Sequence, residues 1–187
     1  MDHAADYIAG LTRALEALDL DSVRRAREMI AQARDEGRQI FLCGNGGSAA
    51  TASHMANDLG KGASCGRDRE QRFRVVALTD NVPWMTALAN DVSYDSIFSE
   101  QLNNLGHPGD LLIAISGSGN SANVLNAVTV AKERGISTIG WTGFDGGALE
   151  GLVDLAIVAD SHHMGRVEDV HTVLMHLMCY YFMEGEG

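Results

Sequence analysis

The sequence predicts a three-layer α-β-α sandwich built on a five-stranded parallel β-sheet. Five short apolar runs alternate with helical patterns along the chain. Such runs are typical of parallel strands that are buried on both faces and connected through helices. No Pro-rich linker or repeat divides the 187 residues, so we expect one domain over 1–187.

Two helices are expected before the sheet, within residues 2–36. Apolar residues recur there at helical spacing, and residues 19–22 offer a break and a cap. Strands are expected at 39–43, 74–78, 110–115, 137–141 and 155–159.

A last helix is predicted over residues 166–183, and its apolar residues cover nearly the whole circumference. A helix that is apolar all round must be buried on all sides, and a small three-layer domain covers only one of them. The sequence therefore predicts a homo-oligomer.

Composition narrows the range of partners. The formal charge of −11, from 14 basic and 25 acidic residues, repels nucleic-acid phosphates, so we expect no nucleic-acid partner. The longest apolar stretch, 177–183, is far shorter than the roughly 20 residues that cross a bilayer, so no membrane span is expected. The acidic N-terminus lacks the features of a signal peptide, which favours the cytoplasm.

A glycine-rich segment, 43–48 (CGNGGS), follows the first predicted strand and opens a helix. Glycines there let the backbone approach an anion, and a helix N-terminus offers unpaired N–H groups. The segment lacks the third glycine of a dinucleotide fingerprint and the lysine of a P-loop. It therefore predicts a general anion site.

A second segment, 115–121 (ISGSGNS), follows the third predicted strand in the same way. Its serines, Ser116, Ser118 and Ser121, make a neutral, hydroxyl-rich cup for an anion. Right-handed crossovers place the loops after each strand along one edge of the sheet, where ligands bind in such folds. The structural alternative is that both segments only cap helices.

The pairing of strand-GNGGS-helix with strand-ISGSGNS-helix resembles the signature of the SIS, or sugar isomerase, domain family. The likeness extends to Asn90-Asp91, to the Thr142-Gly143 turn and to the last helix. Within the family, the chain is most similar to the phosphoheptose isomerases. The resemblance implies the SIS fold and a homotetramer with active sites at subunit boundaries.

The resemblance also implies where a phosphorylated sugar would bind. In the phosphoheptose isomerase pattern the second segment holds the phosphate, and the first lies close to the sugar chain. Carried over, the substrate-binding residues are Asn45, Gly46, Gly47, Ser48, Asn90, Asp91, Ser116, Gly117, Ser118, Ser121 and Glu168.

A metal site is the other implication. His54 and Asp58, four residues apart on a predicted helix, project from one face, which suits two ligands of one ion but is more often a surface pair. The phosphoheptose isomerases carry His-x-x-x-Glu here, and a Gln and a His eight positions apart on the last helix, as zinc ligands. The carry-over gives His54, Asp58, Glu168 and His176 as ligands of a divalent metal, expected to be Zn²⁺. It also gives Asp58, Glu168 and His176 as the proton-transfer groups.

Two of these positions depart from the family pattern, because Asp58 replaces its Glu and Glu168 replaces its Gln. The shorter carboxylate and the added charge can compensate for each other. Residues 168 and 176 lie about 12 Å apart along an ideal helix. Both therefore reach one ion only if the helix starts irregularly near Glu168 or if a neighbouring subunit contributes.

The implied activity is aldose–ketose isomerisation of sedoheptulose 7-phosphate to D-glycero-D-manno-heptose 7-phosphate. Three glycines, Gly62, Gly117 and Gly165, replace a basic residue, a Thr and an Asp of the family, so another ketose phosphate stays open as the substrate. A non-catalytic SIS module that binds a sugar phosphate is the second alternative. The regulator-like subgroup lacks the histidine of the last helix, whereas His176 is present here.

Overall fold

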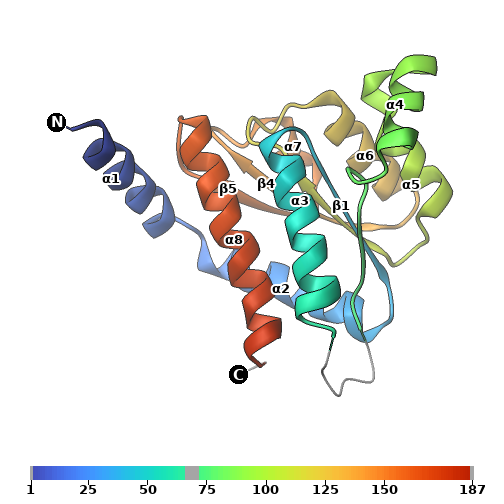
Figure 1. Ribbon diagram of the computed structural model, residues 1–187, viewed down its shortest axis with the longest axis horizontal. Helices are drawn as coiled ribbons and strands as arrows, with labels where there is room; N and C mark the ends of the chain where they lie inside the picture. Colours follow the sequence, from blue (N-terminus) through green and yellow to red (C-terminus); the bar gives the residue numbers. More distant parts are fainter. Residues whose placement is uncertain (1, 66–71, 186–187) are drawn as a thin grey trace.

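A five-stranded parallel sheet forms the centre of the computed structural model, which describes residues 2–65 and 72–185 (Figure 1). The strand order is β2-β1-β3-β4-β5, and every pairing is parallel. The strands are β1 (Gln39–Gly44), β2 (Arg74–Ala77), β3 (Leu111–Ile115), β4 (Ser137–Gly143) and β5 (Leu155–Ala159). All five predicted strands are found, and the predicted parallel sandwich is confirmed.

Helices cover both faces of the sheet (Figure 1). One face carries α1 (His3–Glu16), α2 (Leu20–Asp35), α3 (Gly47–Asn57) and α8 (Met164–Glu184). The other carries α4 (Val82–Asp91), α5 (Ser99–Leu105), α6 (Ala122–Glu133) and α7 (Gly147–Leu152). A π-helical turn, η1 (Asp58–Gly62), follows α3, and a 3₁₀ turn, η2 (Tyr94–Ser96), follows α4.

The first two helices lie within the predicted range, and α1 extends away from the body of the domain (Figure 1). The Asp19 side chain caps α2, because it accepts hydrogen bonds from the Asp21 N–H at 3.0 Å and from the Ser22 hydroxyl at 2.6 Å. Arg166 of α8 holds α1 in place by donating to the Tyr7 and Asp6 carbonyls.

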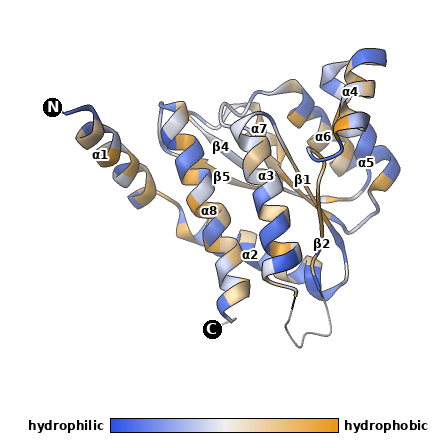
Figure 2. Ribbon diagram, viewed as in Figure 1, coloured by the Kyte–Doolittle hydropathy of each residue, from blue (hydrophilic) through white to orange (hydrophobic). Residues whose placement is uncertain are grey.

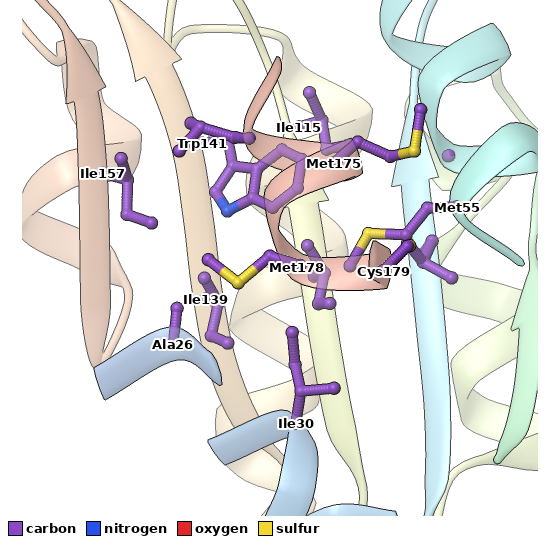
Figure 3. Packing of buried hydrophobic residues seen from close by; sticks show 14 of the residues in the cluster. Ala26, Ile30, Met55, Ile115, Ile139, Trp141, Ile157, Met175, Met178 and Cys179 are labelled. Carbon is purple, nitrogen blue, oxygen red and sulfur yellow. The ribbon is translucent and has the colours of Figure 1, made fainter. Parts of the chain in front are cut away.

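Successive residues of the central strands point into different cores, which is why the strands are apolar throughout. Ile113 and Ile115 of β3 belong to the core under α3 and α8, whereas Leu112 and Ala114 belong to the core under α5 and α6. Figure 3 shows the first core, where Trp141 of the sheet faces α8. Its labelled residues are Ala26, Ile30, Met55, Ile115, Ile139, Trp141, Ile157, Met175, Met178 and Cys179.

The last helix is covered by its own domain along one side only. Met175, Met178 and Phe182 are buried, whereas Leu177 is 50% and Tyr180 48% exposed. The helix alternates polar and apolar patches along its visible side (Figure 2). No helix within residues 2–65 and 72–185 is long and apolar enough to cross a membrane.

Candidate active site

The two anion loops meet where the strand order reverses. β1 and β3 are neighbours in the sheet, and Gly44 at the end of β1 pairs with Ile115 at the end of β3. The chain then leaves β1 into α3 on one face and leaves β3 toward α6 on the other. In open parallel sheets this point forms a crevice that binds ligands.

The loop of residues 116–121, which we call the serine cup, presents hydroxyl and N–H groups. Ser116 is 3% exposed, and its hydroxyl donates to the Ser121 hydroxyl at 3.1 Å. In the part of the chain that the structure describes, the N–H groups of Ala122 and Asn123, in the first turn of α6, have no acceptor. Unpaired helix-start donors and neutral hydroxyls are the groups that bind an anion in an acidic protein.

The loop between β4 and α7, together with the start of α7, packs against the serine cup. Gly119 has a φ of +67°, and a Cβ there would collide with the Gly146 carbonyl, so only glycine fits. The Leu149 N–H donates to the Gly119 carbonyl at 2.9 Å, and the Ala148 N–H donates to Asn120 Oδ1 at 3.0 Å. Sequence reasoning gave this loop no supporting role.

The glycine-rich segment 43–48, which we call the first loop, is held by side chains from α6 and η2. Asn45 Nδ2 donates to Asn123 Oδ1 at 2.8 Å, and Asn123 Nδ2 donates back to Asn45 Oδ1 at 2.9 Å. The Tyr94 hydroxyl also donates to Asn45 Oδ1, at 2.9 Å. Ser48 is 6% exposed, which leaves its hydroxyl little accessible surface. Gly46 adopts a φ of +54° just before α3.

Three predicted metal ligands come together between α3 and α8, which lie side by side (Figure 1). One ligand atom from each of His54, Asp58 and His176 lies within 4.8 Å of the other two. His54 Nε2 is 3.5 Å from Asp58 Oδ2. The rings of His54 and His176 pack edge to face, with their centroids 5.1 Å apart. We call these three residues the His–Asp cluster.

Local backbone geometry helps to build the cluster. Asp58 stands where α3 gives way to the π-helical turn, and its carbonyl accepts from the Ala63 N–H at 2.8 Å. Such turns are frequent at functional sites. The Asn57 side chain donates to Asp58 Oδ1 at 3.0 Å, which orients the carboxylate.

The donors of the cluster fit a divalent ion. A tetrahedral ion with nitrogen and oxygen ligands at normal bond lengths separates them by roughly 3.3–3.5 Å, close to the distance between His54 and Asp58. Two imidazoles and a carboxylate are hard-to-borderline ligands, which suit zinc and its first-row neighbours. The cluster is therefore competent for metal binding.

Glu168, the fourth predicted ligand, lies outside the three-residue cluster. A Cβ on Gly47 would be 2.5 Å from Glu168 Oε1, so the carboxylate packs against the first loop, where glycine leaves it room. Glu168 lines a cavity of about 270 Å³ that Gly47, Thr51 and His54 also line. The helix is regular from Met164 onward, so of the two alternatives for Glu168 the irregular helix start is not found.

The predicted pair Asn90 and Asp91 ends α4, on the other face of the sheet. Both residues are exposed, and Asn90 Nδ2 donates to Asp91 Oδ1 at 2.7 Å. Within residues 2–65 and 72–185, neither forms a hydrogen bond to the first loop or to the serine cup. Their neighbour Ala89 lines a cavity together with Asn45 and Gly46 of the first loop.

The three departing glycines each face a side chain that fills the space of a Cβ. Such an atom would be 2.6 Å from Met164 Sδ at Gly117 and 2.9 Å from the Tyr7 hydroxyl at Gly165. At Gly62 it would collide with the end of Met183. The side chains of Met164, Tyr7 and Met183 thus fill the space that a larger residue would need at the three glycines. The departures from the family pattern are therefore matched by the packing around them.

His171 lies in the core between α8 and β4. Its Nε2–H donates to the Thr142 carbonyl at 3.1 Å, while Nδ1 is buried without a partner among the described residues. Burial lowers the pKa of His171 to about 4, although the bond to Thr142 opposes this change. His171 is therefore a neutral structural residue at neutral pH.

The topology, the serine cup and the His–Asp cluster have the form of an α/β domain with a ligand site at the switch point of its sheet. Residues 5–143 match the family model described as the SIS domain. The chain therefore belongs to the SIS-domain family, as its motifs predicted.

Known relatives narrow this assignment. The phosphoheptose isomerase of Aliarcobacter butzleri is 40% identical over 161 residues, which cover 85% of this chain and 82% of the relative. That of Shewanella denitrificans is 41% identical over 171 residues, covering 89% and 84%. A solved phosphoheptose isomerase from Neisseria gonorrhoeae superposes with a TM-score of 0.87 at 35% identity, covering 98% of this chain and 96% of that one. Within the SIS family, the chain belongs with the phosphoheptose isomerases.

Proposed function

We propose that the protein is a metal-dependent aldose–ketose isomerase that converts sedoheptulose 7-phosphate to D-glycero-D-manno-heptose 7-phosphate. The observation that carries the proposal is the meeting of His176 with His54 and Asp58 on the same domain as the serine cup. The phosphoheptose isomerases of similar sequence support the choice of substrate.

The serine cup would hold the phosphate through the hydroxyls of Ser116, Ser118 and Ser121 and the first N–H groups of α6. The resemblance to the family assigns six further residues to substrate binding: Gly46, Gly47, Ser48, Gly117, Asn90 and Asp91. His54 lies seven residues beyond Gly47, about 10 Å along the helix axis. The helix α3 therefore runs from the loop assigned to the sugar chain to the residues assigned to the metal.

We assign His54, Asp58 and His176 as ligands of a divalent metal, with Zn²⁺ as the preferred ion and Glu168 as a further ligand from a neighbouring subunit. A bound divalent ion supplies a Lewis acid that polarises the carbonyl oxygen. The donor set also accepts manganese, iron, cobalt and nickel. We therefore expect divalent binding without strict selection of zinc.

Isomerisation moves a proton between C1 and C2 through a cis-enediol, so it needs a base near both carbons and an acid at the oxygen. Asp58 or Glu168 is the base in this proposal, and His176 is the opposing acid and base. The cup contributes by fixing the phosphate, which holds the reacting carbons near these groups.

We further propose a homotetramer in which partner subunits cover the exposed side of α8 and the projecting α1. The exposed apolar residues Ile8, Leu177 and Tyr180 support this assembly. Light scattering at micromolar concentration should report four subunits, and a monomer would contradict the proposal. The three free thiols, Cys43, Cys65 and Cys179, suit a reducing compartment, and we propose the cytoplasm.

A panel of ketose phosphates tests the proposed reaction. The purified protein is incubated with pentulose, hexulose and heptulose phosphates, and aldose formation is followed for each. We expect the heptulose phosphate to be converted with the highest kcat/KM. Conversion of a shorter ketose alone would reassign the substrate, and no conversion of any member would favour the non-catalytic alternative.

A further inference from the structure

Side-chain amides tie the two anion loops together, in addition to the sheet beneath them. Asn45 belongs to the loop after β1, and Asn123 belongs to the first turn of α6, directly after the serine cup. Their amides exchange both possible hydrogen bonds, at 2.8 and 2.9 Å. A closed pair of this kind fixes the distance and the relative orientation of the two backbone segments.

Burial makes this pair costly to break. Asn123 is 2% exposed, so its amide has no easy access to water if Asn45 is removed. A buried polar group that loses its partner keeps the full desolvation cost, and hydrogen bonds are stronger in a low dielectric. The pair therefore holds the loops in one arrangement.

Tyr94, in η2, connects a third structural element to the Asn45–Asn123 pair. Its hydroxyl donates to Asn45 Oδ1, which already accepts from Asn123, so both lone pairs of that oxygen are used. Tyr94 and Asn45 also line a cavity of about 210 Å³ between the first loop and α4. Of the polar atoms of the Asn45 side chain, only one N–H remains for a ligand.

We propose that Asn123 and Tyr94 are positioning residues for the phosphosugar. They set the separation between the first loop and the serine cup and aim the remaining N–H of Asn45 at the ligand. The inference deepens the proposed function, because it assumes that one phosphorylated sugar contacts both loops. Inorganic phosphate, in contrast, occupies only the cup and does not report on the separation.

The two ligands therefore separate a positioning role from general damage to the site. Calorimetric titrations of the protein with its metal chelated compare inorganic phosphate with sedoheptulose 7-phosphate. Asn123→Ala keeps the backbone N–H of α6, so the Kd for phosphate should stay within about twofold, while the Kd for the phosphosugar should rise about tenfold.

Two further variants test the coupling. The double variant, Asn45→Ala with Asn123→Ala, should have the same Kd for the phosphosugar as the single variant that binds it more weakly. Either change alone already removes both amide bonds. Tyr94→Phe removes one bond from a residue that is 57% exposed and should raise the Kd for the phosphosugar about threefold. That variant keeps the ring and its packing, so it remains informative if Asn123→Ala fails to fold.

Equal changes in the Kd values of both ligands, or additive effects of the two alanine substitutions, would overturn the inference. An unchanged Kd for the phosphosugar in both Asn123→Ala and Tyr94→Phe would do the same. Both titrations measure binding and not turnover. An inactive wild-type protein would therefore overturn the proposed isomerase alone.

Discussion

The serine cup and the His–Asp cluster are built in opposite ways. The cup comes from six consecutive residues and the helix that follows them, and neighbouring loops of the same domain brace it. The cluster exists only where α3 meets α8, and it joins Asp58 to a residue more than a hundred positions away. The proposed anion site is thus built locally in the chain, whereas the proposed metal site depends on tertiary packing.

Replacing His176 should have the largest effect, because it removes one of the three cluster residues while leaving the cup untouched. His176→Ala should lower kcat/KM about a thousandfold, the usual range for losing a general acid or base. Steady-state kinetics measure this loss, and calorimetry with Zn²⁺ should show weaker metal binding. The Kd for inorganic phosphate should not change.

His107→Ala is the matched control, since this exposed histidine lies near the start of β3, away from the cluster. It should retain wild-type kinetics. Full activity in His176→Ala would show that the cluster does not take part in the reaction.

Acid should weaken the packing of α8, which carries His176 of the cluster, on the sheet, because His171 of this helix donates to the Thr142 carbonyl of β4. The folded-state pKa is lowered to about 4 by burial, so the unfolded chain binds a proton first as the pH falls. The stabilisation is complete above pH about 6.5 and is lost as the pH falls toward 4, by about 3 kcal/mol.

Urea denaturation as a function of pH measures this loss. A His171→Gln variant has no imidazole to titrate, so its stability should fall less over the same pH interval. Parallel pH profiles for the variant and the wild type would show that another group is responsible.

The serine cup should give a smaller and purely binding effect. Ser116→Ala and Ser118→Ala should each raise the KM about tenfold, because each removes a hydroxyl that would donate to a charged phosphate. The value of kcat should change less, since the cluster stays intact. Ser137→Ala, at the exposed start of β4, is the control. An unchanged KM in both cup variants would remove the phosphate assignment.

The contrast between local and long-range construction also explains what could be predicted from the sequence. The strands and the serine cup are each formed by a short contiguous segment. Apolar runs predict the strands, and glycines with serines predict the cup. The His54–Asp58 pair follows from helical spacing, but His176 was assigned only from the resemblance to the family. Glu168 was expected with these ligands, and the regular helix sets it beside Gly47.

Contacts between distant residues gave no sequence signal. Asn45 and Asn123 are 78 positions apart, and Tyr94 is 49 positions from Asn45. Nothing in the spacing of these residues indicates that they meet. Their partnership depends on the order of the strands, which places β1 beside β3.

Metal removal tests the central claim, that one site binds the phosphosugar while the other carries out the reaction. Isomerisation of sedoheptulose 7-phosphate and its Kd are measured before exhaustive chelation, after it, and after Zn²⁺ is restored. We predict that chelation abolishes isomerisation, leaves phosphosugar binding largely intact, and is reversed by the metal. Full activity in the chelated protein, or loss of phosphosugar binding together with activity, would contradict the account.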